Sequence, residues 1–478
     1  MAELIISISG VRGRVDDELT PHVAMRYANV LAGTLHTGLI VNEPEGPRRI
    51  PPLRSSVALR DRPMVLGRDG RRSGHMLAAA AAAGLCAAGR DVVDAGVAAT
   101  PTLGVLVSSL GAAGGLQVTA SHNPQEYNGL KGFGAEGRLL DGVEAGQAAE
   151  AFREGNWYRA EDGRWGRVSN LSDPHAPHLE RLLGVVDVDR IRRQRYRVLL
   201  DANHGAGGCL GRKLLEELGC EVHVLGETPD GAFEHPPEPL AENLKDVAPR
   251  VPELGAAVGF CQDPDADRLA LIDAGGRYLG EEYTLAICAD HVLEQNAGAI
   301  VTNGATSRML DDVAQRHRVP CFRVPVGEVH VVEAMDAHDA VLGGEGNGGV
   351  IDPRVGYVRD SFVAMALVLD AMASRGESVA ELARRLPAYH MIKGRFQVPT
   401  EKNDHVFDKL LSRFDVDEID EISHDDGLRL DWPDRWLLAR PSNTEPLMRL
   451  IVEATTAQAA QELYDEAANV IASALGKR

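Results

Sequence analysis

The chain has 478 residues, 44% of them hydrophobic and 25% charged, which is the composition of an ordinary soluble globular protein. A chain of this length is too long for one hydrophobic core, and it predicts three or four domains. Fifty basic residues against seventy acidic ones give a net charge of −20. That balance argues against general nucleic-acid binding, and it requires any phosphate site to collect its positive charge locally.

The six cysteines are scattered, without a Cys-x-x-Cys pair, and we expect them to be reduced. The first residues lack the basic start and long apolar core of a signal peptide. The apolar stretch 77–88 is too short and too rich in alanine to cross a bilayer. These features predict a cytoplasmic protein that does not enter a membrane.

Three stretches share one pattern, in which a short β-branched run, a turn and an amphipathic helix lead to a second strand. The strands are expected at 63–70 and 91–96, at 196–203 and 221–225, and at 298–304 and 321–325. The last two pairs enclose helices expected at 211–218 and 307–317, and the first encloses an alanine-rich helix. This is the βαβ order of a parallel sheet, and its recurrence predicts three related α/β domains.

The C-terminal part has a different pattern. Apolar and polar residues alternate, as in strands of an antiparallel sheet, at 394–398, 427–432, 436–439 and 448–453. A helix is expected from 457 to about 475, so this part predicts a smaller α+β domain. The expected domains are 1–170, 171–275, 276–388 and 389–478.

The stretch from Thr119 to Lys131 presents Ser121 at the exit of a predicted strand, among many polar groups. A serine hydroxyl placed there, beside His122 and Lys131, can carry a phosphoryl group. The tetrapeptide Ser-His-Asn-Pro is also consistent with a simple turn, because Ser, Asn and Pro all favour turns.

Three aspartates, Asp263, Asp265 and Asp267, alternate just before a predicted buried strand. In an extended chain their side chains point to one side, and hard oxygens without His or Cys favour Mg²⁺ over zinc. A calcium loop of the EF-hand type is excluded, because it needs Gly and Glu where Arg268 and Ala274 stand. A solvated acidic turn is the remaining alternative. A cation would relieve the repulsion among the carboxylates and leave Arg268 available for a phosphate.

The stretch 343–349 is rich in glycine and carries one carboxylate, Glu345, and one amide, Asn347. It lacks the Gly-Lys-Ser/Thr of a P-loop, and its side chains suit sugar hydroxyls better than phosphates. A flexible turn is the alternative.

A second polar loop lies between two predicted strands near the C-terminus, and its guanidiniums, hydroxyls and amide could form a phosphate cradle. Its candidate residues are Arg440, Ser442, Asn443, Thr444 and, just beyond, Arg449. A polar hairpin turn is the alternative. Near the N-terminus, Arg12 could bring one more cation to the site.

Taken in order, these stretches resemble the α-D-phosphohexomutase superfamily, which includes phosphoglucomutases, phosphomannomutases and phosphoglucosamine mutases. The specific motifs are Thr119-Ala-Ser-His-Asn-Pro124 and Asp263-Pro-Asp-Ala-Asp-Arg268. The resemblance covers essentially the whole chain. It implies three α/β domains with mixed sheets and a C-terminal α+β domain around a central cleft. It also implies an isomerase that moves a phosphoryl group between O6 and O1 of a hexose through a phosphoserine and a hexose 1,6-bisphosphate.

The resemblance further implies a role for each candidate residue. Ser121 would be the phosphorylated serine and would complete a Mg²⁺ site with the three aspartates. The transferring group would be surrounded by Arg12, His122, Lys131 and Arg268. Sugar hydroxyls would be held by Glu345 and Asn347, and the non-reacting phosphate by Arg440, Ser442, Asn443, Thr444 and Arg449.

The sugar loop departs from a common family pattern, Gly-Glu-x-Ser-Gly-His. Here Asn347 replaces the hydroxyl, and Gly349 stands where many relatives have a histidine proposed for proton transfer. After Val326-Gly327 the Lys or Arg of many relatives is missing, and His330 is either a substitute or structural. The general base is therefore left unassigned.

The same loop resembles a branch typified by archaeal sequences and favours phosphoglucosamine mutase as the activity. The alternatives are phosphomannomutase or phosphoglucomutase and, more remotely, a phosphoserine-dependent sugar phosphatase or a non-catalytic sugar-phosphate binding protein. A monomer or a homodimer is expected.

Overall fold

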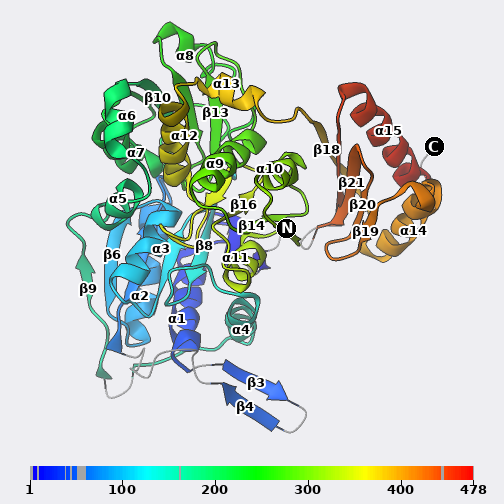
Figure 1. Ribbon diagram of the computed structural model, residues 1–478. Helices are drawn as coiled ribbons and strands as arrows, with labels where there is room; N and C mark the ends of the chain where they lie inside the picture. The colour runs from blue at the N-terminus through cyan, green and yellow to red at the C-terminus, as the bar shows by residue number, and fades with distance from the viewer. Residues whose placement is uncertain are drawn as a thin grey trace. The chain divides into compact units, whose positions relative to one another are not determined.

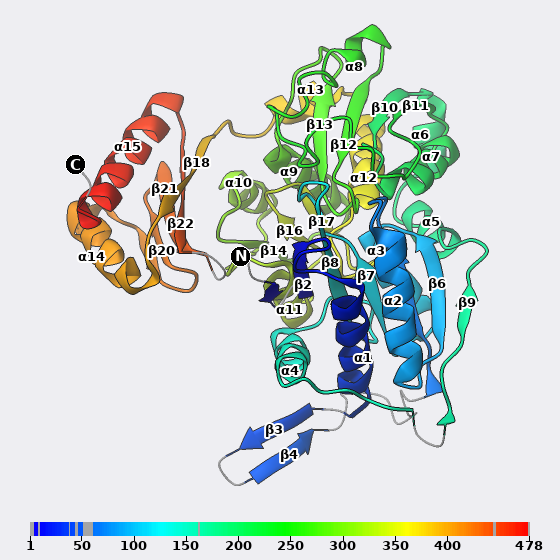
Figure 2. The same ribbon diagram turned by 180° about the vertical axis from the view of Figure 1, so that it is seen from behind.

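The computed structural model describes residues 4–7, 10–37, 39–43, 46–50, 61–160, 163–442 and 446–476. Its chain divides into two compact units, and each is described by itself. The first unit contains residues 1–288 and 348–382, and the second contains residues 289–347 and 383–478. Many of the elements are labelled in Figure 1, and further ones in Figure 2.

The N-terminal part of the first unit is built on a mixed seven-stranded sheet. Its strand order is β1 (Ile5–Ser7), β2 (Gly10–Arg14), β8 (Tyr127–Phe133), β7 (Gly114–Val118), β5 (Met64–Arg68), β6 (Val92–Val97) and β9 (Val168–Asn170). The strand β5 pairs in parallel with β6 and β7, as the βαβ pattern predicts. The neighbours β7 and β8 are antiparallel, so the loop between them joins two adjacent strand ends at one edge of the sheet.

Four helices accompany this sheet: α1 (Pro21–Thr37), α2 (Gly74–Ala87), α3 (Thr100–Ser109) and α4 (Gly142–Arg153). The alanine-rich helix α2 lies directly alongside α1 (Figure 2). A Cβ added at Gly84 would lie only 2.1 Å from the carbonyl oxygen of Met25. Small residues are therefore needed in α2, because the two helices approach each other closely. A further two-stranded hairpin, β3 (Leu39–Glu43) and β4 (Gly46–Ile50), was not predicted.

The second sheet of this unit has the order β11 (Glu221–Leu225), β10 (Arg197–Asp201), β12 (Val258–Gln262) and β13 (Leu269–Asp273). The strand β10 is parallel to both neighbours, whereas β12 and β13 are antiparallel. The associated helices are α5 (Ala176–Leu183), α6 (Val188–Gln194), α7 (Gly207–Glu217) and α8 (Arg250–Glu253). The strand β17 (Gly349–Ile351) and the helix α12 (Ser361–Arg375), which is buried from residue 361 to 373, complete the unit.

In the second unit, β14 (Ile300–Asn303) pairs in parallel with β15 (Cys321–Val324) and β16 (Leu342–Glu345). The helices of this part are α10 (Met309–His317) and α11 (Glu328–Ala337). Two further helices, α9 (Glu281–Gln295) and α13 (Val379–Arg384), span the points where the chain passes between units.

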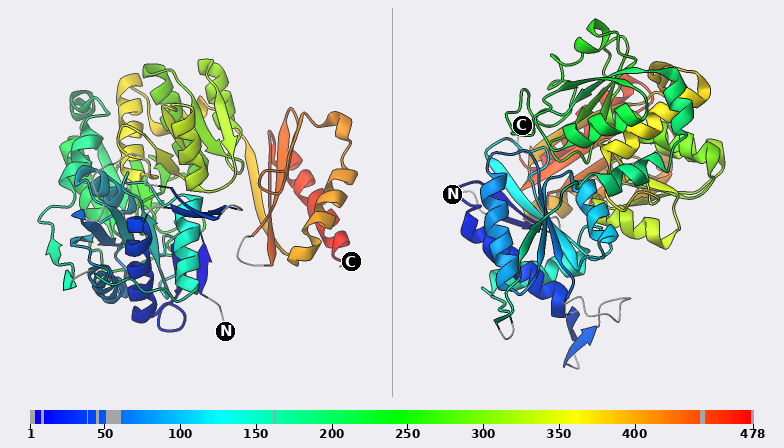
Figure 3. Two further views of the ribbon diagram at one scale, coloured as in Figure 1. Left: turned by 90° about the horizontal axis from the view of Figure 1, so that it is seen from below. Right: turned by 90° about the vertical axis from the view of Figure 1, so that its left-hand side faces the viewer.

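The C-terminal part is an antiparallel five-stranded sheet with the order β18 (His390–Gln397), β22 (Leu447–Ala454), β21 (Arg435–Pro441), β20 (Leu428–Asp431) and β19 (Glu421–Ser423). The helices α14 (Asn403–Arg413) and α15 (Ala457–Ala474) lie on one face of it (Figure 3). A hydrophobic core of residues from all these layers fills the space between them. The predicted fold class, three α/β parts and a C-terminal α+β part, is confirmed.

Among the described residues, no helix combines the length and the apolar character that crossing a membrane requires.

Candidate active site

The three aspartates lie in the tight connection between β12 and β13 of the first unit. All three are completely buried, and one oxygen of each lies within 4.8 Å of the others. The prediction that the aspartates alternate along an extended chain is wrong, because residues 264–266 form a turn in which Ala266 has a positive φ of 56°. The turn, and not strand geometry, gathers the carboxylates.

Ser121 reaches this cluster from the loop between β7 and β8. Its Oγ donates a hydrogen bond to Asp263 Oδ2 at 2.9 Å. The other oxygen of Asp263 accepts the backbone N–H groups of Asp267 at 3.0 Å and Arg268 at 3.1 Å, which fixes the turn. The serine and the acidic cluster, which are more than 140 positions apart in the sequence, therefore meet in one place.

The donor set fits a divalent cation. The Oδ1 atoms of Asp265 and Asp267 are buried and have no hydrogen-bond partner among the described residues. Burial, together with the charges of Asp267 and Asp265, raises the pKa of Asp263 well above its ordinary value. Buried carboxylates that repel one another and carry open oxygens can be held by a hard cation such as Mg²⁺.

Positively charged side chains bind the Oδ2 atoms of Asp265 and Asp267. Lys131 Nζ lies 2.7 Å from Asp265 Oδ2 and 3.3 Å from Asp267 Oδ2, and Arg359 Nη2 lies 2.6 Å from Asp267 Oδ2. Burial alone would raise the pKa of Asp267, but Arg359 and Lys131 outweigh it and lower that pKa. Thr100 adds a hydroxyl that donates to Asp265 Oδ2 at 2.6 Å. The Oδ2 atoms of Asp265 and Asp267 are thus bound by side chains, whereas Arg268 Nε lies 3.8 Å from Asp267 Oδ1.

Arg359 explains why position 349 is glycine. A Cβ added at Gly349 would lie 2.3 Å from Cδ of Arg359. The arginine therefore fills the space that a side chain at 349 would take. Gly349 was expected only as the replacement for a histidine, and Arg359 was not predicted, because no motif marks that residue.

His122 lies next to the serine hydroxyl, with Nδ1 3.2 Å from Ser121 Oγ. The charge of Arg268, then burial, then the charge of Arg12 lower the pKa of His122 well below its ordinary value, so the imidazole is neutral at pH 7. Arg268 lies 3.4 Å from Glu238, a carboxylate that sequence reasoning did not identify. Arg12, on β2, stands opposite Gly129 on β8.

The predicted sugar-binding residues lie in the second unit. Glu345 ends β16 and is 4% exposed. Its oxygens accept the side-chain amides of Asn303 at 2.7 Å and Asn347 at 3.3 Å. The backbone N–H of Gly346 donates to Thr306 Oγ1 at 3.0 Å. The structure thus brings Glu345 and Asn347 together and fixes the carboxylate from the end of β14.

The predicted phosphate loop lies between β21 and β22. Asn443 and Thr444 are outside the described residues. The backbone N–H of Ser442 donates to the carbonyl of Leu447 at 2.7 Å, and Arg440 Nε donates to Asp426 at 2.6 Å.

Arg440 is the cross-strand neighbour of Arg449, and Arg449 is that of Arg395 on β18. Directly opposed residues of an antiparallel pair share a face. Three arginines therefore form a row across this sheet, and Arg395 was not predicted.

Four models of the phosphoglucomutase/phosphomannomutase family match successive parts of the chain. The α/β/α domain I model matches residues 53–158, domain II 176–276, domain III 281–389, and the C-terminal domain 378–470.

Relatives match along nearly the whole length. A phosphoglucomutase/phosphomannomutase of Thermococcus kodakarensis is 36% identical over 98% of both chains. A probable phosphoglucosamine mutase of Methanopyrus kandleri is 33% identical over 97% of this chain and 96% of its own. A crystal structure of a phosphoglucomutase/phosphomannomutase family protein from Burkholderia thailandensis superposes with a TM-score of 0.82, at 28% identity over 98% of both chains.

Proposed function

The chain belongs to the phosphoglucomutase/phosphomannomutase family of the α-D-phosphohexomutase superfamily, and from that premise we propose that its preferred substrate is a glucosamine phosphate. As a phosphohexose mutase it is an isomerase. The glucosamine preference is supported by the Gly344-Glu-Gly-Asn-Gly-Gly349 loop and by the name of the Methanopyrus relative. The name of the Thermococcus relative supports the alternative, a mannose or glucose phosphate.

We propose Ser121 as the phosphoryl carrier, and the observation that supports it is its hydrogen bond to Asp263 in the buried acidic cluster. In the proposed reaction a sugar hydroxyl oxygen forms a bond to phosphorus while the bond from phosphorus to Ser121 Oγ breaks. The hydroxyl proton goes to a base that stays unassigned. The bisphosphorylated sugar then turns round, and its other phosphate forms a bond to Ser121 Oγ while its bond to the sugar oxygen breaks. That oxygen takes up the proton from the base, which restores the enzyme.

The surrounding side chains supply charge and position. Arg12, neutral His122, Lys131 and Arg268 would contact the transferring phosphoryl group, which accumulates negative charge that fixed cations stabilise. Mg²⁺, when bound by Asp263, Asp265, Asp267 and the phosphate on Ser121, would neutralise further phosphoryl charge.

The residues of the second unit would bind the parts of the substrate that do not react. Glu345 and Asn347 would bind sugar hydroxyls. The non-reacting phosphate would be bound by Arg440, Ser442, Asn443, Thr444 and Arg449. A guanidinium binds a phosphate through paired N–H donors, which suits the arginines to this role.

We further propose the domain division 1–170, 171–275, 276–388 and 389–478, a hexose 1,6-bisphosphate as activator, and a monomer or homodimer as the working form. All six cysteines are free thiols, which supports a reducing, cytoplasmic setting.

The first test is Ser121→Ala, compared with Ser374→Ala, whose hydroxyl donates only to a carbonyl within α12. We expect Ser121→Ala to lower turnover by several orders of magnitude, because the nucleophile is lost. Intact-mass spectrometry should find a phosphate on the wild type and on the Ser374 variant, and none on the Ser121 variant. Near-normal turnover by Ser121→Ala would refute the proposed carrier.

The substrate preference is tested by comparing the glucosamine, mannose and glucose phosphates, each with Mg²⁺ and the matching bisphosphate. A higher kcat/KM for the glucosamine phosphate is expected. Equal values for all three sugars would contradict the preference, and release of inorganic phosphate at the isomerisation rate would indicate a phosphatase.

A further inference from the structure

Arg71 is a completely buried arginine that none of the sequence motifs includes. It follows β5, and its side chain is 0% exposed. A guanidinium has five N–H donors in a rigid plane. Nη2 donates to the carbonyl oxygens of Ser121 at 2.6 Å and Asn123 at 2.5 Å, and Nη1 donates to those of Pro124 at 2.6 Å and Tyr127 at 2.9 Å. Four donors therefore bind the backbone of one loop, residues 121–127, here called the serine loop.

The fifth donor anchors the arginine itself. Arg71 Nε donates to Asp69 Oδ2 at 3.1 Å, and the same carboxylate oxygen accepts the hydroxyl of Thr119 at 2.7 Å. Thr119 Oγ1 in turn accepts the backbone N–H of Ser121 at 2.9 Å. The serine is thus bound on both sides of its peptide unit, through its carbonyl by Arg71 and through its N–H by Thr119.

These hydrogen bonds maintain an unfavourable backbone conformation at Ser121. Ser121 has a positive φ of 49°, a left-handed conformation that is unfavourable for a residue with a side chain. Such a conformation persists only where the surroundings determine it. The hydrogen bonds made by the carbonyl and the N–H of Ser121 hold this conformation. In it, Oγ is directed at Asp263.

The loop that follows β11 covers the arginine, whose side chain is 0% exposed. The ring of Phe233 lies over the guanidinium, with its centroid 5.2 Å from Cζ. A Cβ added at Gly231 would lie 2.8 Å from the Cα of Arg71, and the positive φ of Gly231, 65°, also favours glycine there. Hydrogen bonds from a charged donor to carbonyl groups are strong in such a water-excluded place.

We propose that Arg71 is a positioning residue that holds the serine loop, and with it Ser121, in the conformation that phosphoryl transfer requires. This inference rests on the proposed function of Ser121. Arg71 does not touch the substrate, so its loss should lower kcat and leave KM unchanged. A displacement of about 1 Å at a reacting atom can cost on the order of a hundredfold in rate.

The test is Arg71→Lys in the full-length protein. Lysine keeps the charge but has three donors on one atom, so it cannot bind four carbonyls and Asp69 together. We expect kcat to fall about a hundredfold, with KM unchanged. Hydrogen–deuterium exchange of peptides covering 119–127 should become faster, and the phosphate on Ser121 should be lost to water sooner.

Arg190→Gln is the matched control. Arg190 donates twice to the buried carboxylate of Asp370, at 3.1 and 2.7 Å, and takes no part in the proposed site. This variant should lose thermal stability without faster exchange in 119–127. If residues 119–127 of Arg71→Lys exchange at the wild-type rate, the inference is overturned. It is also overturned if the kcat of Arg71→Lys equals that of Arg190→Gln.

A second variant covers the case in which Arg71→Lys does not fold. Asp69→Asn removes the charge that orients Nε and should give a smaller change of the same kind, a lower kcat with faster exchange in 119–127. Unchanged kcat and exchange in that variant would equally overturn the role of Arg71. If the wild type isomerises no sugar phosphate, the proposed function fails, and the exchange data alone decide whether Arg71 orders the loop.

Discussion

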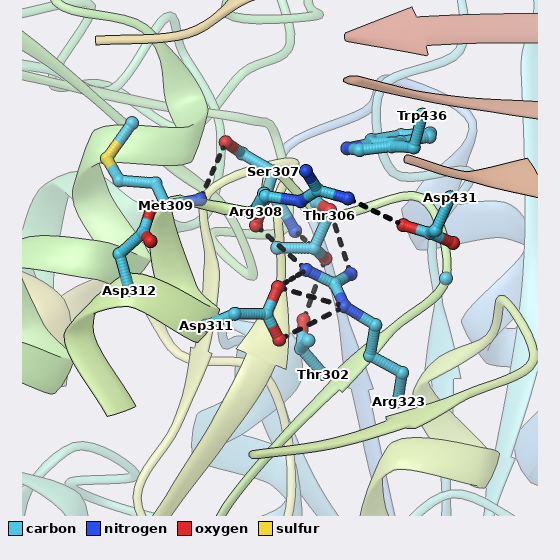
Figure 4. Close-up of polar contacts among 12 residues, drawn as sticks. Thr302, Thr306, Ser307, Arg308, Met309, Asp311, Asp312, Arg323, Asp431 and Trp436 are labelled. Carbon is cyan, nitrogen blue, oxygen red and sulfur yellow. Dashed lines mark hydrogen bonds and ion pairs between the residues drawn. The ribbon is translucent and has the colours of Figure 1, made fainter. Parts of the chain in front are cut away.

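Two arginines in different parts of the molecule hold loops at strand ends in the same way. Arg71 binds four carbonyls of the serine loop and pairs with Asp69. Arg323, on β15 of the second unit, donates to the carbonyls of Asn303 at 3.0 Å, Thr306 at 2.9 Å and Ser307 at 3.1 Å. It also pairs with Asp311 (Figure 4). A planar fork with five donors suits this task better than any other side chain.

The two loops differ in what they position. The serine loop carries the proposed nucleophile, whereas the loop held by Arg323 follows Asn303, the last residue of β14, whose amide binds Glu345. Arg71 is fully enclosed, while the side chain of Arg323 is 20% exposed. In the sheet that contains β10 there is no such arginine among the described loop contacts, and Asn203 binds the loop at 234–235 instead. An arginine that binds loop carbonyls thus supports the proposed reacting group in one domain and a proposed binding group in another.

The comparison can first be tested at Gly349 of the first unit, which packs against Arg359, a binding partner of Asp267 in the acidic cluster. In Gly349→Ala the new Cβ would displace Arg359 and break its bond to Asp267. We expect the free energy of unfolding, measured with urea, to fall by about 2 kcal/mol.

Gly146→Ala is the control, because its Cβ would meet nothing within 4 Å in α4. It should raise the free energy of unfolding by about 0.5–1 kcal/mol. Equal stability of the two variants would show that Arg359 does not need the space at 349.

Arg323→Lys separates binding from reaction. Loss of carbonyl bonds should loosen Asn303 and hence Glu345, so we expect KM for the sugar phosphate to rise about tenfold, the equivalent of roughly 1.4 kcal/mol, with kcat little changed. Steady-state kinetics of both variants should show a raised KM for Arg323→Lys and a lowered kcat for Arg71→Lys. A fall in kcat with faster exchange in 119–127 would remove the distinction between the loops.

His235 gives the smallest effect and extends the comparison to the second sheet. Burial lowers its pKa, but the hydrogen bond from Nε2 to Asp201 at 2.8 Å, the charge of Asp201 and the hydrogen bond to the Pro236 carbonyl together outweigh burial, and the pKa is raised. A raised pKa adds stability below pH 6.5 that is lost as pH rises through the folded-state value. Thermal unfolding from pH 6 upward should therefore show a small decline that His235→Gln abolishes. A decline of the same size in that variant would assign it to other groups.

The sequence predicted those parts of the site that lie within short contiguous motifs. Ser121, Lys131 and the three aspartates were predicted because their residue types and spacing are specific, and the structure brings them together. The family assignment made from them is confirmed. The βαβ order and the antiparallel C-terminal sheet were likewise predictable from periodicity.

The residues that support those motifs were not predictable. Arg71, Arg359 and Glu238 are single charged residues in ordinary surroundings, and only tertiary contacts bring them to the site. The arrangement of the aspartates was also not predicted, because the turn depends on a left-handed conformation at Ala266 that the local sequence does not indicate.

The row formed by Arg395, Arg449 and Arg440 has an electrostatic consequence for the C-terminal sheet. Like charges on facing positions of neighbouring strands weaken a sheet. An anion bound over the row would reduce that repulsion further than Asp426, which already pairs with Arg440, so part of its binding energy would come from weakening a repulsion between neighbouring strands. The ligand would then add to a counter-charge that the fold already supplies, and dissolved salt could partly replace it.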